Sequence, residues 1–470
     1  MNPDRQEQDD SEYRRTGRVN GGGHGDACSA RPKVPEGSAQ EPLASTQEET
    51  VSPIKEPRPL LGRYRRAGLA LLIGFGLTLL QLGMVLVFAP GANEAAGAGE
   101  FGARWSSLFQ HDSFWFENIM ERGYASTVPP APYKSFEVSN VAFFPGYPLL
   151  AGFLKDRWDL ESRAALLLAA LASAWVFWSY AVVFLMRWHL PWRWTAVALA
   201  MIAAHPAALF MVAAYSESLF LAMLLGFLFW SSREGKVSAL LAAVHGFGMT
   251  ATRIVGIPCA FASGGGGRIG GGMLRRLERR FWITFVAVLG AVLFFAFCQA
   301  RFGSWDFYMQ TQKAGWGVTP EFLEPLRWGH YTLFAPDWTQ PRQVSQFSMA
   351  VTIWMVGLMG VAEVLAQWQA RRRGISSGVR VRLPFYFCAV AVFYIAAAGV
   401  ASVGFESMIR YQFCTWVLGV LAAAHLFAVV PPQGRVTRGA LLLLAVFLIA
   451  AGWWLQGIYA GIFTRGGWFA

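Results

Sequence analysis

Long apolar runs separated by arginine-rich stretches constrain this fold more than any other feature of the chain. The runs at 67–89, 162–186 and 438–458 are each long enough to cross the hydrocarbon core of a bilayer, which takes about 20 apolar residues in a helix. Only 15% of the 470 residues are charged, whereas 54% are hydrophobic. Soluble domains carry about 25% charged residues. The sequence therefore predicts an all-α polytopic membrane protein with about 11 hydrophobic segments.

The positions of the basic residues predict how the chain is oriented. Arginine clusters at 63–66, 275–280 and 371–373 lie between apolar runs, which is the distribution found in cytoplasmic loops. Because no basic face with interleaved stacking aromatics lies outside these loops, nucleic-acid binding is excluded despite the net charge of +11. The membrane would be the cytoplasmic membrane of a bacterium, or the endoplasmic reticulum of a eukaryote.

Composition divides the chain into a tail and one membrane domain. Residues 1–62 are polar and poor in large apolar side chains, so they are predicted to form a disordered cytoplasmic tail. Residues 63–470 form the transmembrane domain, with two long outer loops at 90–160 and 301–345. The first loop is expected to contain short interfacial helices and the catalytic site. The apolar stretch 237–263 contains glycines, Arg253 and Pro258, which favours two half-helices lining a protein cavity.

The best candidate for chemistry is Asp112, which lies among aromatic residues just after the first apolar run. A carboxylate in a partly dry site can act as a general base towards a hydroxyl group. The ordinary alternative is an N-cap of the helix that begins here, since Asp caps well. The neighbouring His111 could assist with charge, or could be a local hydrogen-bond partner. Neither the five cysteines nor the histidines and carboxylates show the spacing of a metal site.

Charged residues inside later apolar segments are candidates for binding an anion. Arg253 and Arg410 have the fork geometry that matches a phosphate group. Structural pairing of Arg253 with Glu217 or Asp112, and snorkelling of Arg410 to lipid headgroups, are the alternatives. Glu217 follows an outer turn, where it could belong to a polar site or simply reach water.

Aromatic and amide residues in the two outer loops are candidates for a substrate groove. The run Phe143–Pro148 has its backbone fixed by two prolines, and could form a groove wall or an interfacial anchor. In the second loop, Lys313 lies among amides and tryptophans, which suits phosphate contact and sugar stacking, but also an interfacial belt. The residues predicted to line the groove are His111, Trp115, Tyr124, Phe144, Tyr147, Glu217, Gln310, Trp316 and Tyr411.

Taken together, these motifs resemble the PIG-V family, the mannosyltransferases of glycosylphosphatidylinositol (GPI) anchor assembly, within the GT-C glycosyltransferases. The motifs that carry the resemblance occur in the expected order: Asp112 with Trp115 and Gly123-Tyr124, Phe143–Pro148, Tyr215–Phe220, Thr252-Arg253, Gly303–Gly317 and Arg410-Tyr411. Two positions depart from the family pattern. His111 stands where the family usually has Trp, and Ile254 stands where Pro is common. The composition, poor in sulfur and rich in glycine, alanine and arginine, favours a bacterial relative, as do the divergent motifs.

The resemblance implies an inverting glycosyltransferase that moves a sugar, expected to be mannose, from a polyprenyl-phosphate donor to a glycolipid acceptor. Asp112 would deprotonate the acceptor, and Arg253, Lys313 and Arg410 would bind the departing phosphate. It implies no cofactor and no metal, an active site on the non-cytoplasmic face, and membrane lipid as a partner with a possible small membrane subunit. The alternatives are a transporter of a lipid or solute built around 237–263, and a non-catalytic subunit of a glycan-assembly complex.

Overall fold

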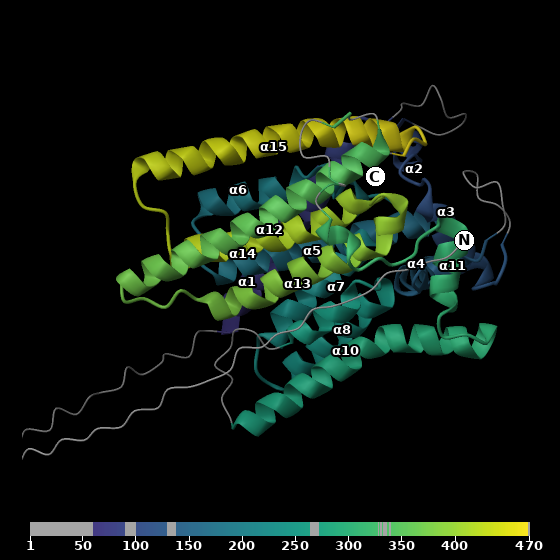
Figure 1. Ribbon diagram of the computed structural model, residues 1–470, viewed down its shortest axis with the longest axis horizontal. Coiled ribbons are helices and arrows are strands. Elements are labelled where there is room, and N and C mark those ends of the chain that lie inside the picture. Colours follow the sequence, from purple (N-terminus) through teal and green to yellow (C-terminus); the bar gives the residue numbers. More distant parts are fainter. Residues whose placement is uncertain are drawn as a thin grey trace, which may run out of the picture. The chain divides into compact units, whose positions relative to one another are not determined.

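The computed structural model describes residues 60–89, 100–128, 138–263, 272–327, 329, 331, 336–337 and 340–468. They belong to one compact unit, Arg58–Ala470, in which helices pack side by side (Figure 1). The prediction of a disordered tail at 1–62 falls almost wholly outside the described residues. Apart from one bridge between Val128 and Val138, regular structure in the described part is helical. The predicted all-α class is confirmed.

Seven helices of the described part are long and apolar enough to cross a membrane, so the chain is an integral, multi-pass membrane protein. They are α1 (Leu60–Leu86), α5 (Ser162–Arg187), α10 (Met273–Phe302), α12 (Pro341–Arg372), α13 (Val379–Val400), α14 (Met408–Val429) and α15 (Arg435–Thr464).

Three further hydrophobic segments form shorter helices. The apolar run 194–212, long enough for one membrane span, is divided instead: α6 (Trp192–Ala203) ends, and the 3-10 helix η3 (Pro206–Met211) follows. Pro206 has no N–H group and cannot continue the preceding helix. The helix α7 (Glu217–Ser231) then forms the most enclosed part of the core, with nearly all of its side chains buried.

The predicted break in 237–263 is confirmed. Helix α8 (Lys236–Thr252) ends at Arg253, which has an extended backbone, with φ −152° and ψ 141°. The short helices α9 (Gly256–Cys259) and η4 (Ala260–Ala262) follow. The two parts are unequal in length, and Pro258 lies in the first turn after the break, where its missing N–H group is tolerated. The break places the backbone and side chain of Arg253 beside a cavity.

Short helices gather at one end of the bundle. In the first outer loop these are α2 (Glu100–Ser106), α3 (Asp112–Arg122), η2 (Asn140–Ala142) and α4 (Gly146–Trp158). Helix α11 (Phe307–Trp316) and the 3-10 helices η5 (Glu324–Leu326) and η7 (Ala401–Val403) belong to later connections. Helices α2, α3, α4 and α11 are seen together on the right of Figure 1. The expectation of short helices in 90–160 is therefore confirmed for its described residues.

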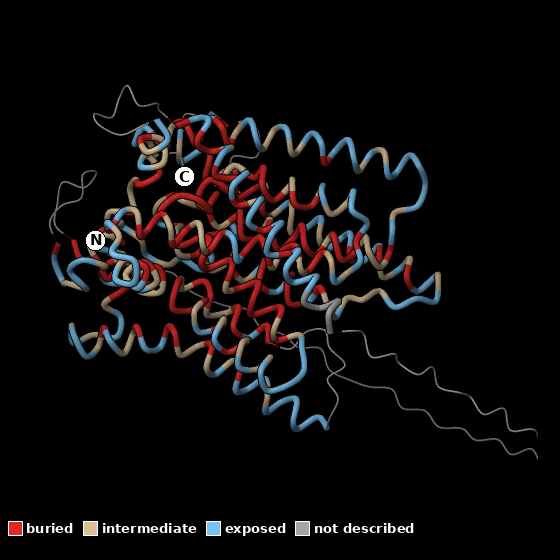
Figure 2. Tube along the Cα trace, turned by 180° about the vertical axis from the view of Figure 1, so that it is seen from behind, coloured by how far each residue is buried: buried red, intermediate tan, exposed pale blue. Residues whose placement is uncertain are grey.

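The buried core lies in the middle of the bundle, and the outer helices expose apolar side chains (Figure 2). Helix α14 buries most of its residues, whereas α12 and α15 expose large side chains such as Trp354 and Trp454. In a membrane, such exposed apolar surface faces lipid tails and needs no polar cover. Helix α14, like α7, thus lies in the interior of the bundle, and its first turn carries Arg410.

Close packing of α8 against α10 depends on Gly290. A Cβ atom at this position would lie 2.2 Å from the Phe247 carbonyl oxygen and 2.5 Å from Thr250 Oγ1. Since packed helices cannot move apart without loss of contacts, we expect Gly290→Ala to destabilise the protein by about 1–3 kcal/mol. Thermal unfolding of the detergent-solubilised protein measures the effect. Gly357→Ala on α12, where no atom lies within 4 Å of the new Cβ, is the control. Equal melting temperatures for the two variants would contradict this packing.

Candidate functional site

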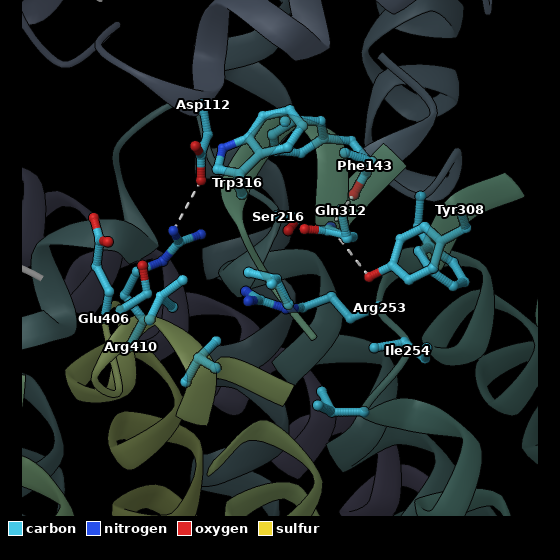
Figure 3. A pocket seen from close by; sticks show the side chains of 18 of the residues that line it. Asp112, Phe143, Ser216, Arg253, Ile254, Tyr308, Gln312, Trp316, Glu406 and Arg410 are labelled. Carbon is cyan, nitrogen blue, oxygen red and sulfur yellow. Dashed lines mark hydrogen bonds and ion pairs between the residues drawn. The ribbon is translucent and has the colours of Figure 1, made fainter. Parts of the chain in front are cut away.

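A cavity of about 750 Å³ opens at the end of the bundle where the short helices gather. Its walls come from the start of α3, the η2–α4 connection, the α8–α9 break, helix α11 and the first turn of α14. Figure 3 shows Asp112, Glu406 and Arg410 on one side of this cavity, and Tyr308 and Ile254 on the other. Elements that are far apart in the sequence therefore form a single polar site.

Asp112 is the first residue of α3, and its carboxylate points at an arginine. Its Oδ2 atom lies 2.8 Å from Nη1 of Arg410. The N-cap position belongs to His111, so the alternative of Asp112 as an ordinary helix cap is not realised. The start of α3 is fixed by hydrogen bonds: the Asp112 N–H donates to Tyr215 Oη at 3.3 Å, and Ser113 Oγ donates to the Ala214 carbonyl at 3.0 Å.

Glu217 joins the two arginines beneath the cavity. Its Oε1 lies 2.6 Å from Nη1 of Arg253 and 2.6 Å from Nη2 of Arg410. Glu217 is only 4% exposed, so it does not reach water as one alternative expected. The pairing of Arg253 with Glu217 is found, and Arg253 also lines the cavity. Together with Asp112, the network contains two carboxylates and two guanidinium groups, so its charges balance. This balance offsets the large cost of burying charge.

Aromatic rings hold both guanidinium groups in place. Arg253 Cζ lies 4.8 Å from the centroid of the Tyr411 ring, and Arg410 Cζ lies 4.8 Å from that of Tyr215. Cation–π contacts of this length are attractive, the more so when both groups are desolvated. Burial also raises the pKa of the Tyr215 phenol well above its usual value, so this side chain stays neutral beside the arginines. The positive charges at the cavity are therefore fixed before any ligand binds.

The opposite side of the cavity is built on α11. Gln312 donates from Nε2 to the Ala142 carbonyl at 2.8 Å and to Tyr308 Oη at 3.3 Å, which fixes the helix against η2. Burial raises the pKa of Tyr308, so its hydroxyl remains a donor. Lys313, on the next position of the helix, is exposed and lines the cavity. It forms no ion pair with any residue that the structure describes, so its charge is available to a ligand.

Most of the predicted site residues line this cavity. Eight do so: His111, Asp112, Phe144, Arg253, Lys313, Trp316, Arg410 and Tyr411. Glu217 lies directly beneath them, where it contacts Arg253 and Arg410. The remaining four, Trp115, Tyr124, Tyr147 and Gln310, do not line it.

Packing explains these four exceptions. Trp115 is buried behind the wall, where it contacts Phe143 and Trp316. The hydroxyl groups of Tyr124 and Tyr147 donate to the carbonyls of Phe143 and Leu166, at 2.8 and 2.7 Å. Gln310 points away from the cavity and donates to Asp306 Oδ1 at 2.9 Å. These side chains support the wall instead of forming its surface.

Other residues that line the cavity were not among the predicted site residues, including four with polar or aromatic side chains: Tyr308, Gln312, Glu406 and Trp468. Gln312 and Tyr308 could have been chosen over Gln310, because residues four apart share a helix face. Glu406 lies in the turn between η7 and α14, where Phe405 and Ser407 have positive φ angles of 65° and 67°. Non-glycine residues persist in such strained conformations only where the surroundings hold them, which is common at functional sites.

No family model and no curated protein matches the chain, so the resemblance to the PIG-V family stays a prediction. Solved structures that the chain resembles include ArnT from Cupriavidus metallidurans bound to undecaprenyl phosphate, at 12% identity and a TM-score of 0.43, covering 84% of this chain and 75% of that one. The oligosaccharyltransferase of Archaeoglobus fulgidus, tethered with an acceptor peptide, has 13% identity and a TM-score of 0.43; the match covers 84% of this chain and 55% of that one. At this level of similarity, neither an activity nor a substrate follows from the match.

Proposed function

We propose that this protein is an inverting glycosyltransferase that moves a sugar from a polyprenyl-phosphate donor to a hydroxyl group of a glycolipid acceptor. One observation carries the proposal. The carboxylate of Asp112 and three cationic side chains, Arg253, Lys313 and Arg410, line a single cavity in a membrane protein. A base and preorganised positive charge are the two groups that displacement of a phosphate ester by a hydroxyl requires.

In the proposed reaction, Asp112 accepts the proton of the acceptor hydroxyl as its oxygen attacks the anomeric carbon of the donor. The bond between that carbon and the phosphate oxygen breaks, and the phosphate leaves with the electron pair. A single displacement inverts the anomeric configuration. Arg410 holds the Asp112 carboxylate in place through the 2.8 Å contact. The Asp112 carboxylate then needs no reorganisation at the moment of reaction.

Lys313 is the side chain that we assign first to the leaving phosphate. Arg253 and Arg410 each direct a nitrogen to Glu217, at 2.6 Å, so part of their charge is already compensated. Lys313 projects into the cavity from α11 without such a partner among the described residues. Arg253 would add a second contact from the α8–α9 break. Loss of one charge-stabilising donor typically lowers a rate by about 10²–10³.

We place the site on the non-cytoplasmic face. The basic clusters lie at the opposite ends of the same helices: α10 begins with Arg275 and Arg276 and leads to α11 at its other end. Likewise, α12 ends at Arg372, and α13 begins shortly after it. The other end of α13 leads to residues that line the cavity. Positive charge marks the cytoplasmic ends of membrane helices.

Mannose is the sugar that we propose, from the motifs that resemble the PIG-V family. The test uses membranes from cells that express the protein and from matched cells that do not. A polyprenyl-phosphate [³H]mannose donor is added, and the label in glycolipid products is measured. We expect label in a new glycolipid only with the protein present. Equal labelling in both membranes would contradict the proposal.

We further propose that transfer requires no bound metal, because Arg253, Lys313 and Arg410 supply the positive charge at the leaving phosphate. Treatment of the purified protein with EDTA, followed by removal of the chelator, is therefore expected to leave the transfer rate unchanged within about twofold. The rate of label transfer before and after treatment measures this. A loss of activity that added Mg²⁺ or Mn²⁺ restores would show that a metal contributes charge that the arginines and Lys313 do not.

A further inference from the structure

The segment that follows α15 turns back against the candidate site. Gly466 has a φ of 81°, in the region that favours glycine. The N–H groups of Arg465 and Gly467 both donate to the Ile462 carbonyl, at 3.2 and 2.9 Å. A Cβ atom on Gly467 would lie 2.7 Å from Ile462 Cγ2. Two glycines thus make a tight turn that a bulkier sequence could not form, and the turn leads directly to Trp468.

His111 holds this turn beside the catalytic residue. Its Nε2–H donates to the Gly467 carbonyl at 3.0 Å, and its ring packs edge-on against Trp468 with centroids 5.0 Å apart. His111 itself has a φ of 48°, a strained conformation for a residue with a side chain. Since Asp112 is the next residue, the contact ties the end of α15 to the start of α3. It also gives a physical role to the histidine that stands where the PIG-V pattern has Trp.

Trp468 forms part of the cavity surface. Its indole is half-buried and lines the cavity together with Asp112 and Arg410. The Arg410 Cζ atom lies 5.9 Å from the centroid of the indole, and Phe210 packs at 6.4 Å. These contacts hold the ring on the protein side, in a position where it presents apolar surface to a ligand near Asp112.

We propose that Trp468, positioned by His111, is the wall on which the sugar ring of the acceptor stacks. The inference rests on the proposed function. A tryptophan ring is flat and apolar, so it complements the C–H face of a pyranose, while Arg410 and Glu406 at the same side of the cavity suit its hydroxyl groups. The acceptor is favoured over the donor because Trp468 packs against His111, the neighbour in sequence of Asp112, beside which the reacting hydroxyl must lie. Lys313 lies on α11, which forms the other wall of the cavity.

The test compares Trp468→Ala, Trp468→Leu and Trp468→Phe, with Trp454→Ala as the control. Trp454 lies on α15 and is exposed outside the cavity. The probes are polyprenyl-phosphate [³H]mannose as donor and a total lipid extract of the host membranes, titrated as acceptor. We expect Trp468→Ala and Trp468→Leu to raise the apparent KM for the extract about tenfold. Trp468→Phe keeps a flat ring and should stay within about threefold of wild type. The KM for the donor should stay within about twofold in all variants, and Trp454→Ala should match wild type.

The following results would contradict the assignment of Trp468 to the acceptor. An unchanged KM for the extract in Trp468→Ala, or an equal rise in the KM for the donor, would overturn the assignment to the acceptor. If Trp468→Ala does not fold, the Leu and Phe variants decide, because both keep apolar volume and only one keeps a ring; equal KM values for these two would also overturn it. Failure of the wild-type protein to transfer label would overturn the proposed function and this inference together. A normal wild-type rate with unaffected Trp468 variants overturns the inference alone.

Discussion

Replacement of Asp112 by Asn is expected to lower sugar transfer by about 10²–10⁴ while the protein still folds and inserts, because general-base catalysis typically contributes this factor. Asparagine has nearly the same shape, and its amide oxygen can still accept a hydrogen bond from Arg410, which lies 2.8 Å from the carboxylate. It cannot take a proton from the acceptor hydroxyl. Arg410 also keeps its contact with Glu217, so its charge is not left without a partner.

The measurement is the initial rate of label transfer by purified protein, normalised to the amount of folded protein. Asp156→Asn on α4 is the matched control, since Asp156 is exposed and lies outside the cavity. This variant should transfer at the wild-type rate. A rate for Asp112→Asn within about threefold of wild type would exclude Asp112 as the base.

Replacement of Glu217 by Gln is expected to destabilise the protein by about 3–5 kcal/mol, the usual cost of removing one partner of a buried ion pair. Glu217 is 4% exposed, and both arginines contact its Oε1 atom at 2.6 Å. The substitution changes the balanced network to an excess of one positive charge, with two guanidinium groups close together. Thermal unfolding in detergent should show a melting temperature lower by about 5–10 °C.

A second substitution tests whether charge balance is the cause. In the double variant Glu217→Gln/Arg253→Gln, the remaining pair of Asp112 and Arg410 is again neutral. We expect the double variant to be more stable than Glu217→Gln alone, a coupling that a double-mutant cycle measures. Glu161→Gln, at an exposed position before α5, should unfold at the wild-type temperature. If the second substitution instead adds to the loss, the network is not held by balanced charge.

The sequence was sufficient to predict the long membrane helices, and its charged candidates Asp112, Arg253, Lys313 and Arg410 line one cavity. Apolar length alone marks helices such as α5 and α15, since a bilayer imposes that length. Asp112 and Arg410 are 298 residues apart, and both were candidates for one site, but their direct contact was not predicted. Pairing of Arg253 with Glu217 was one of the alternatives. The ion-pair partners of Arg410 were not predicted, because topology gives the side of the membrane on which a residue lies and not the residues that it contacts. Glu217 contacts both Arg253 and Arg410 only because the packing of the helices brings the three residues together.

Side-chain direction and long-range packing were the parts that could not be predicted. Tyr147 and Trp115 belong to motifs near Asp112, yet their hydrogen bonds and ring contacts direct them into the wall. Trp468 lies in a glycine-rich segment with no local signal of function, and it reaches the cavity only through the turn after α15. Pro206 explains why the run 194–212 is divided into α6 and η3, because proline cannot continue a helix. The hydropathy of the run does not reveal this break.

The configuration of the product tests the central claim most directly, namely a single displacement at the donor with Asp112 as the base. Purified protein in proteoliposomes is supplied with a polyprenyl-phosphate sugar of known anomeric configuration and the acceptor lipid extract, and the new glycosidic linkage is determined by NMR. The account predicts a linkage of the opposite configuration to that of the donor, and no such product from the Asp112→Asn variant. A product that retains the donor configuration would contradict it.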